Sequence, residues 1–145
     1  MHIQASTDYA LRALLYLATT PAERFVPASE VAAAYGLSAH HVSKICKDLT
    51  ARGWLEGRRG SGGGVRLAQP ADSLRLGQVV AALEPLDLVE CLRADGGECV
   101  ITPGCKLKRA LEQARKAFLR ALDEHTLADL SRGRTLGRLL GLDAT

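Results

Sequence analysis

A pair of short helical segments joined by a tight turn constrains the fold of this chain most. The first segment, SEVAAAYG over residues 29–36, ends in glycine, and Ser38 begins the second. Serine is a strong helix N-cap, and glycine is the usual residue just after a helix. Val42, Cys46 and Leu49 repeat on one side of the second segment, whose other faces are polar. The pattern predicts a helix-turn-helix with a basic second helix.

A glycine-rich hairpin follows the second helix directly. WLEGRR has the pattern of a strand, GSGGG makes the turn, and VRL returns. Arg58 and Arg59 precede the turn and Arg66 follows it. A phosphate-binding loop is disfavoured because the segment lacks the Lys-Ser/Thr pair of a P-loop and opens no helix. A hairpin flanked by arginines at this place is typical of a wing, so we expect residues 1–84 to form a winged helix-turn-helix that binds DNA.

Basic residues gather in the same part of the chain. The net charge is +3 overall, yet residues 36–70 alone hold six basic and two acidic residues. Lysine and arginine supply affinity for phosphates, whereas shorter polar side chains reach base edges. A second basic block, residues 106–120 with six basic residues and one glutamate, is more simply a solvated surface. The candidate DNA-binding residues are Ser38, His40, His41, Ser43, Lys44 and Lys47 in the second helix, and Arg58, Arg59 and Arg66 in the wing.

Helices around an irregular loop account for the rest of the chain. Residues 6–18 begin with Ser-Thr-Asp, which suits a helix start, and residues 74–83 form a short helix before Pro85. A longer helix from Cys105 to His125 carries apolar residues at steps of four and three, as a coiled-coil seam does. We expect the same helix of a second copy to cover this seam and form a homodimer. The seam consists of Leu107, Leu111, Ala114, Phe118, Ala121 or Leu122, and His125.

The expected fold class is therefore mainly α with a small β wing. Its parts are the winged helix-turn-helix, a loop over residues 85–104, a long dimerisation helix over 105–127 and a C-terminal tail over 128–145. A chain of 145 residues with 47% hydrophobic and 24% charged residues fits one globular domain. No run reaches the roughly 18 apolar residues of a membrane span, and no export signal opens the chain. A cytoplasmic protein with no membrane partner is expected, and the absence of paired carboxylates or a nucleophile–base set argues against an enzyme.

Three of the four cysteines lie close together along the irregular loop. Cys91, Cys99 and Cys105 are spaced C-x7-C-x5-C, and the chain has no C-x-x-C pair. Zinc ribbons and thioredoxin-type redox pairs use that short spacing, so both are disfavoured. Wide spacing suits the separated irons of an iron–sulfur cluster, although the three residues can also be ordinary thiols. Cys46 lies on the apolar side of a helix, where cysteine packs as a small hydrophobe.

Five segments resemble the Rrf2 family of bacterial regulators over nearly the whole chain. They are STDYALRALLYLA, the helix pair SEVAAAYGLSAHHVSKICKDLTARGWL, RRGSGGGVRLAQP, LRLGQVVAALEPLDLVEC and ITPGCKLKRAL. Within the family, ALEPL-LVEC, ITPGCKLK and LDEHTLADL are most similar to the NsrR-type repressors, which respond to nitric oxide. That resemblance implies a dimeric repressor of a double-stranded operator, in which Cys91, Cys99 and Cys105 bind an iron–sulfur cluster. It further implies that nitrosylation of the cluster releases the DNA.

The resemblance also bears on the type of cluster and on its fourth ligand. The IscR-type regulators carry a histidine three residues after the last cysteine, where this chain has Lys108. A His-ligated 2Fe–2S cluster is therefore disfavoured, and 4Fe–4S is favoured. The S-T-D-Y motif resembles one whose acidic residue ligates the cluster of the partner subunit, which implies Asp8. The alternative is that Asp8 only stabilises the start of its helix.

Two other interpretations of function stay open. One is a thiol-based or iron-level sensor with the same fold, and the other is an iron–sulfur carrier. The Cys91–Cys99 loop is about two residues longer than is usual in the family, and the Gly96-Gly97 pair can absorb the extra length.

Overall fold

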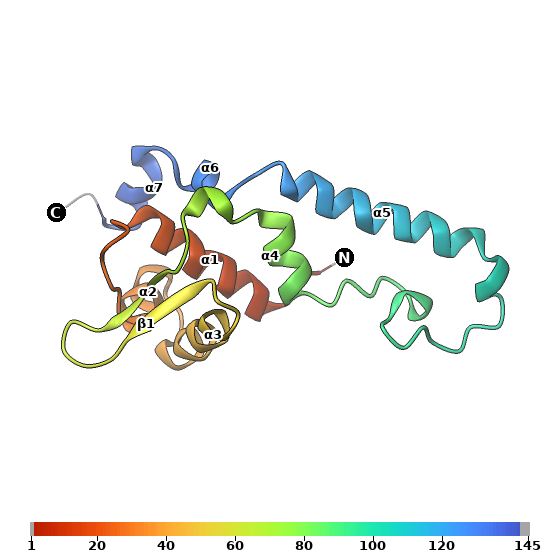
Figure 1. Cartoon of the computed structure of the whole chain (residues 1–145), viewed down its shortest axis with the longest axis horizontal. Coiled ribbons are helices and arrows are strands. Elements are labelled where there is room, and N and C mark those ends of the chain that lie inside the picture. The colour runs from red at the N-terminus through yellow and green to blue at the C-terminus, as the bar shows by residue number, and fades with distance from the viewer. Residues whose placement is uncertain (1, 143–145) are drawn as a thin grey trace.

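A computed structural model describes residues 2–142 of the chain and shows a winged helix-turn-helix from which one long helix projects (Figure 1). The helices are α1 (Ala5–Thr19), α2 (Ala28–Tyr35), α3 (Ala39–Ala51), α4 (Leu76–Leu83), α5 (Lys106–Asp123), α6 (Leu127–Ser131) and α7 (Arg134–Leu139). Strands β1 (Leu55–Arg58) and β2 (Gly64–Leu67) form the hairpin, and short 3-10 turns lie at Ala71–Ser73 (η1), Glu90–Leu92 (η2) and Thr102–Gly104 (η3). The expected fold class is confirmed.

The hydrophobic core lies around α1. Leu14 of α1 is fully buried against side chains from the helix-turn-helix and the wing, among them Val42, Leu49 and Leu55. Cys46 belongs to the same cluster, and burial raises the pKa of its thiol to about 11. The predicted packing role of Cys46 is confirmed.

The turn between α2 and α3 forms as the sequence pattern predicts. Gly36 ends α2 with a φ of 63°, a left-handed conformation that costs glycine little. The N–H of Leu37 then donates to the Ala32 carbonyl at 2.9 Å. Ser38 is the N-cap of α3, and its hydroxyl oxygen accepts from the His41 N–H at 3.5 Å. These local contacts fix the start of α3 relative to α2.

The start of α1 differs from the sequence expectation. The helix begins at Ala5 with Gln4 as its N-cap, so it does not begin at the Ser-Thr-Asp motif. The N–H of Gln4 donates to both carboxylate oxygens of the buried Glu84, at 3.2 and 3.3 Å. A carboxylate at a helix N-terminus satisfies a free N–H and interacts favourably with the helix dipole. Thr7, part of the expected capping motif, is instead buried within the first turns of α1 and donates to the Leu83 carbonyl at 3.5 Å.

The expected helix over residues 74–83 is two residues shorter in the structure. Leu74 and Arg75 are extended, and α4 begins at Leu76. The Leu74 carbonyl accepts from the Leu127 N–H at 2.8 Å, and Arg75 forms an isolated antiparallel bridge with Thr126. Because the segment after α5 pairs with these two residues, they are not available to a helix.

The long helix α5 projects beyond the core, on the far side of α4 (Figure 1). Its C-terminal end is held by α4, since the Asp123 carboxylate accepts from the Gln78 N–H at 3.0 Å. None of its residues, all of which the structure describes, is buried. Along the predicted seam, Leu107 is 65% exposed, and Leu111 and Phe118 are half-buried. The apolar stripe of α5 is therefore only partly covered within one chain.

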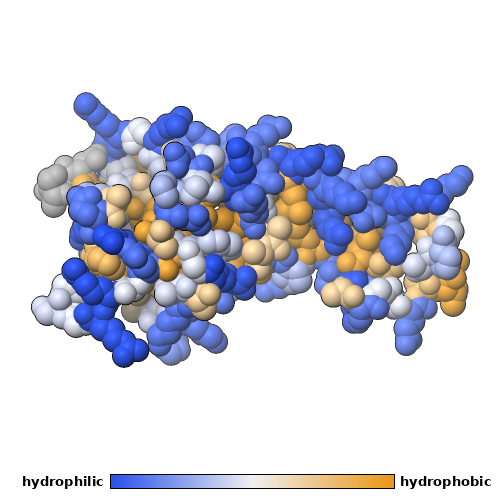
Figure 2. Space-filling view, viewed as in Figure 1, coloured by the Kyte–Doolittle hydropathy of each residue, from blue (hydrophilic) through white to orange (hydrophobic). Residues whose placement is uncertain are grey.

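Apolar side chains also gather where α5 begins. Val100 is 92% exposed and Ile101 61% exposed, next to Leu107. Figure 2 shows hydrophobic surface along this projecting part of the molecule. In the C-terminal tail, α6 and α7 fold back, and Leu127, Leu140 and Leu142 join the core cluster. None of the helices described here is long and apolar enough to cross a membrane.

Candidate functional site

The exposed face of α3 carries the residues that the sequence singled out for DNA contact. Val42, Cys46 and Leu49 are buried, so the polar side chains between them must point away from the core. The rings of His40 and His41 lie 6.2 Å apart, centroid to centroid. Five of the six predicted residues of α3 and its N-cap are exposed, and Ser43 is half-buried. The exposed ones are Ser38, His40, His41, Lys44 and Lys47. The structure thus presents them on one helix, at the start of which Ser38 also serves as the cap.

The three wing arginines have different surroundings. Arg58 donates from Nη2 to the Gly62 carbonyl at 2.6 Å, and Arg66 forms an ion pair with Glu56. Arg59 is exposed, and no ion pair or hydrogen bond engages its guanidinium among residues 2–142. Arg59 is therefore the wing arginine whose charge is most available to a phosphate.

Phe25, for which no sequence pattern indicates a role, contacts two of these arginines. The Arg58 guanidinium carbon lies 4.4 Å from the centroid of the Phe25 ring, and the Arg66 guanidinium carbon lies 4.5 Å from it. Phe25 precedes α2 in a loop without a recognisable motif. A local pattern could not have found it, because the contact depends on the pairing of Val26 with Val65 of the wing.

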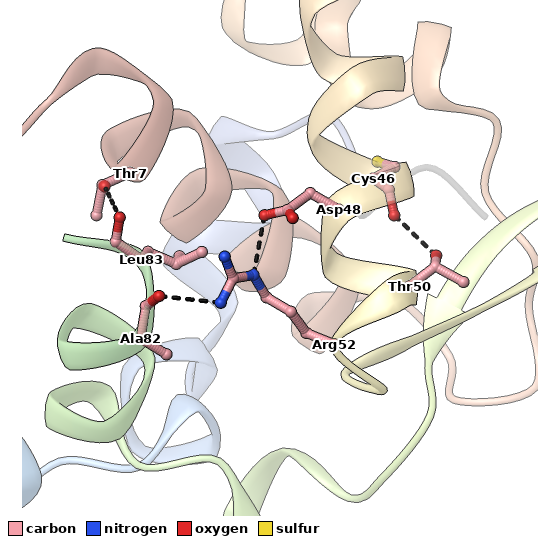
Figure 3. A network of polar contacts seen from close by, with 7 residues as sticks. All are labelled: Thr7, Cys46, Asp48, Thr50, Arg52, Ala82 and Leu83. Carbon is pink, nitrogen blue, oxygen red and sulfur yellow. Dashed lines mark hydrogen bonds and ion pairs between the residues drawn. The ribbon is translucent and has the colours of Figure 1, made fainter. Parts of the chain in front are cut away.

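A chain of polar contacts connects α3 with the end of α4 (Figure 3). Arg52, the C-cap of α3, donates from Nη1 to the Ala82 carbonyl at 2.9 Å and from Nε to Asp48 Oδ2 at 2.9 Å. Thr7 of α1 donates to the next carbonyl, that of Leu83. A cavity of 490 Å³ lies beside this network, and its lining includes Ser6, Tyr9, His41, Lys44, Asp48 and Arg52. Helix α3 is thus joined to the end of α4, where residues 85–105, called the cysteine loop below, begin.

The cysteine loop carries three free thiols outside the core. Cys91 lies in η2 and is half-buried, Cys99 is exposed, and Cys105 is half-buried at the start of α5. The Cys105 sulfur accepts from the Lys108 N–H at 3.3 Å and caps that helix. Within residues 2–142, no three His, Cys, Asp or Glu side chains are grouped closely enough to hold a metal ion. The structure therefore places the three thiols on one loop and does not assemble them into a ligand set within the chain.

Polar contacts among its own residues hold most of this loop. The Glu90 carboxylate accepts from the Glu98 N–H at 2.8 Å, and Arg93 pairs with Asp95 at 2.6 Å. One bond reaches α5, from Arg115 to the Leu92 carbonyl at 3.4 Å. Leu92 is buried in this segment, whereas its neighbours are exposed or half-buried. A segment with so little buried apolar surface can rearrange at low free-energy cost. The loop would have to rearrange in this way to bring its three thiols together.

Asp8 is engaged within its own helix. Its carboxylate accepts from Arg12 Nε at 3.0 Å and from Arg12 Nη2 at 2.8 Å, and the hydrogen bond raises the pKa of Arg12. The Asp8 side chain remains 44% exposed beside an open cavity lined also by His2, Ile3, Tyr9 and Leu37. Within residues 2–142 of one chain, Asp8 is paired with Arg12 and is not grouped with the three cysteines. Ligation of a partner subunit's cluster by Asp8 stays a prediction.

These features define a class of protein, a winged-helix DNA-binding protein with a cysteine-bearing loop. The profile of the Rrf2 family, described as an iron-dependent transcriptional regulator, matches residues 3–133. The chain belongs to the Rrf2 family. It is therefore a DNA-binding transcriptional regulator and not an enzyme, and regulators of this family typically act as dimers.

Solved structures of other bacterial regulators share the fold. CymR (YrzC), the global cysteine regulator of B. subtilis, is 27% identical with a TM-score of 0.73, over 90% of this chain and 96% of that chain. T. potens IscR is 25% identical with a TM-score of 0.69, over 90% of this chain and 85% of that chain. Staphylococcus aureus CymR, 21% identical with a TM-score of 0.68 over 90% of this chain and 98% of that chain, supports the fold alone. The NsrR-type subgroup stays a prediction.

Proposed function

We propose that this regulator is a homodimeric repressor that senses nitric oxide through an iron–sulfur cluster held by its cysteine loop. The observation that carries the proposal is the placement of three free thiols, all outside the core, on a loop that follows directly from α4. The end of α4 is hydrogen-bonded to α3 through Arg52. A change in the loop can thus reach the recognition helix. The domain division of the chain, with its boundaries at residues 84, 104 and 127, is part of this proposal.

DNA binding uses α3 and the wing. In each subunit α3 lies in a major groove and the hairpin follows the neighbouring minor groove, with the two recognition helices about 34–36 Å apart on a two-fold symmetric operator. The side chains of His40, His41 and Ser43 contact base edges, and the Ser38 hydroxyl lies at the same end of α3. Positive charge for the phosphates comes from Lys44, Lys47, Arg58, Arg59 and Arg66. An operator as partner implies that the protein works in the cytoplasm.

Dimerisation uses the partly covered apolar stripe of α5. Leu107 is exposed at the start of this helix, and Leu111 and Phe118 are half-buried further along it. Apolar residues that stay partly or fully exposed at coiled-coil spacing gain most by packing against the same helix of a second copy. This arrangement places the two cysteine loops beside the dimer interface.

The donor chemistry of the loop fits an iron–sulfur cluster. Cys91, Cys99 and Cys105 would supply three thiolates, and Asp8 of the second copy would supply the oxygen ligand of a 4Fe–4S cluster. When bound, the cluster supplies an iron site that reacts with nitric oxide. The chain's own part is to gather the thiols, exclude water around them and hold the end of α4 in the arrangement that binds DNA. The family's description as iron-dependent supports the proposal.

Transmission from the loop to DNA depends on the residues at the end of α4. Glu84 binds the N-terminus of α1, and the carbonyls of Ala82 and Leu83 are bound by Arg52 and Thr7. Displacement of the loop would pull on these contacts and change the tilt of α3. Because two recognition helices must fit one operator together, a small tilt in each weakens binding.

A thiol-based sensor is the second candidate. The exposure of Cys99 and the separation of the three thiols in this chain favour it, as does the 27% identity to a global cysteine regulator. In that case a peroxide would oxidise two of the thiols to a disulfide and be reduced to water, taking up both thiol protons, and the new bond would displace the loop. An iron–sulfur carrier is disfavoured because it would not need the exposed recognition helix and wing.

Anaerobic purification separates the two candidates. We expect a coloured protein whose iron and sulfide counts and visible and electron-paramagnetic spectra show a cluster, and which releases promoter DNA on addition of nitric oxide. Each of three single substitutions should abolish cluster retention, because each removes one of only three thiolate ligands. The substitutions are Cys91→Ala, Cys99→Ala and Cys105→Ala. Cys46→Ala is the matched control and should retain the cluster. A colourless protein that releases DNA only on thiol oxidation would establish the second candidate.

A further inference from the structure

Phe25 is held against the wing by the backbone beside it. The N–H of Val26 donates to the Val65 carbonyl at 2.8 Å, and the N–H of Val65 donates back to the Val26 carbonyl at 2.8 Å. Val26 is fully buried. Gly64 has a φ of 144° and no side chain, and a Cβ there would overlap the Val26 carbonyl. The close approach that glycine permits therefore fixes residue 25 beside the hairpin.

The register of the hairpin places both arginines on one face. Arg58 pairs with Gly64 and Glu56 pairs with Arg66, so these four residues point to the same side of the two strands. The Phe25 ring contacts both guanidinium groups on this side, at 4.4 and 4.5 Å. A cation within about 6 Å of a ring centroid is attracted by the electron-rich face of the ring. One aromatic residue thus engages two cations of the wing.

The neighbouring contacts complete the constraint on these two side chains. Arg66 pairs with Glu56 and donates from Nη1 to the Glu23 carbonyl at 3.4 Å, and Arg58 donates to the carbonyl of Gly62 in the turn. Long flexible side chains lose rotamer freedom when they bind DNA, and side chains already ordered lose less. Arg59 directly follows Arg58, the last residue of β1, so its backbone continues from the held strand.

We propose that Phe25 is a positioning residue for DNA binding. Its ring orders Arg58 and Arg66 and holds the hairpin in the shape that presents Arg59 to the minor groove. The inference rests on the wing being a DNA contact, as in the proposed function. It goes further by assigning part of the DNA affinity to a residue outside the helix-turn-helix and the wing. The effect comes from the electron-rich face of the Phe25 ring and not from the size of the side chain.

This role is tested by substitutions at position 25 that change the aromatic ring and the size of the side chain separately. The full-length dimer is titrated with a duplex that the wild-type protein itself selects from a random-sequence pool, and with an unselected duplex of the same length. Phe25→Leu should weaken binding of the selected duplex about tenfold, because two cation–ring contacts are lost. Phe25→Tyr keeps the ring and should bind within about twofold of wild type. Thermal melting and far-UV circular dichroism of each variant report the fold.

Two further measurements exclude a merely structural effect. In a background of Arg58→Gln and Arg66→Gln, Phe25→Leu should cost little further affinity, because the partners of the ring are already gone. Trifluorophenylalanine at position 25 keeps the size of the ring and weakens its electron-rich face, so it should fall between wild type and Phe25→Leu even if the leucine variant folds poorly. The proposal would be overturned if Phe25→Leu and Phe25→Tyr bound DNA equally well. It would also be overturned if Phe25→Leu lost as much DNA affinity in the Arg58→Gln, Arg66→Gln background as in the wild-type protein.

The failure of the proposed function looks different. If the wing does not contact DNA, Arg59→Ala should leave binding of both duplexes unchanged, and so should every substitution at position 25. If the wing binds DNA without help from Phe25, Arg59→Ala should weaken binding while Phe25→Leu matches wild type.

Discussion

Arg52 donates a hydrogen bond from Nη1 to the carbonyl oxygen of Ala82 at 2.9 Å and so joins the C-cap of α3 to the last turn of α4 (Figure 3). The two residues lie 30 positions apart in the chain. The same guanidinium pairs with Asp48 and lies 6.0 Å from the Trp54 ring. This side chain is the polar connection between the recognition helix and the segment that leads into the cysteine loop.

This connection predicts that substitutions of Arg52 and Asp48 lower the stability of the fold by different amounts. Arg52→Ala removes the bond to Ala82 together with the ion pair, and it should lower the free energy of unfolding by about 1 kcal/mol. Asp48→Ala leaves the bond to Ala82 in place and should cost less than about 0.5 kcal/mol, because the arginine is 37% exposed and water screens the pair. Urea denaturation of both variants measures the difference. Equal losses would assign the stabilisation to the ion pair.

The wing arginines should differ in the salt dependence of DNA binding. Arg59→Ala should lower the log–log slope of affinity against salt by about 1, since its charge is available for one phosphate. Arg66→Ala should weaken binding with a smaller change of slope, because Arg66 is paired with Glu56 and stacked on Phe25. Titrations at several salt concentrations, with a random duplex as control, give the slopes. A full unit of slope lost in Arg66→Ala would show that the pairing with Glu56 does not weaken the phosphate contact of Arg66.

The four thiols should divide into three reactive ones and one inert one. In reduced, cluster-free protein at a mildly alkaline pH, Cys91, Cys99 and Cys105 should react quickly with a chromogenic disulfide, whereas Cys46 should react only after denaturation. Burial raises the pKa of Cys46 to about 11, so its thiolate is scarce under those conditions, and only the thiolate attacks. Four fast equivalents in the native protein would contradict the burial of Cys46.

The raised pKa of Cys46 also predicts how stability changes in alkaline solution. The folded chain holds this proton more tightly than the unfolded chain does. The stabilisation is therefore complete below the ordinary thiol pKa and is lost progressively as pH rises toward about 11. Cys46→Ala removes this part of the pH dependence, and denaturation curves of wild type and variant at several alkaline pH values measure the difference.

Asp8 has two roles to separate. If it ligates iron, Asp8→Ala should leave a cluster on three thiolates with an altered visible spectrum and an altered rate of reaction with nitric oxide. If it acts only in the first turn of α1, the spectrum stays unchanged, and the loss of the exposed pair with Arg12 should cost about 0.5 kcal/mol of stability. Asp8→Cys is the matched variant, since a thiolate in place of the carboxylate should slow the reaction only at a true ligand position.

Mixed dimers test which subunit supplies the carboxylate. When Asp8→Ala subunits are mixed with Cys99→Ala subunits, ligation across the interface leaves one site complete and the other without both ligands. Ligation within a subunit instead leaves two sites with one defect each. The presence or absence of wild-type spectral behaviour at one site per dimer distinguishes the arrangements.

Local chemistry explains why much of the DNA-binding region follows from the sequence alone. Gly36 and Ser38 form the turn between α2 and α3 through contacts within a few residues, and GSGGG bends the hairpin in the same way. The apolar repeat of α3 identifies its buried face, because a regular helix fixes which residues share a side. The solvent-facing polar residues of α3 and the packing role of Cys46 follow from that one periodicity.

Contacts between distant residues decided the rest. The start of α1 depends on Glu84, 80 positions away from Gln4, so the capping motif at Ser6 misleads. Phe25 contacts the wing because Val26 pairs with Val65. Arg66 differs from Arg59 because Glu56 lies opposite it across the hairpin and because it also contacts Phe25 and the Glu23 carbonyl. The spacing of the three cysteines is visible in the chain, but whether their sulfur atoms share one site depends on loop geometry and on a second subunit. Sequence patterns report interactions over one or two turns of chain, whereas these contacts arise when folding brings distant segments together and buries the surfaces between them.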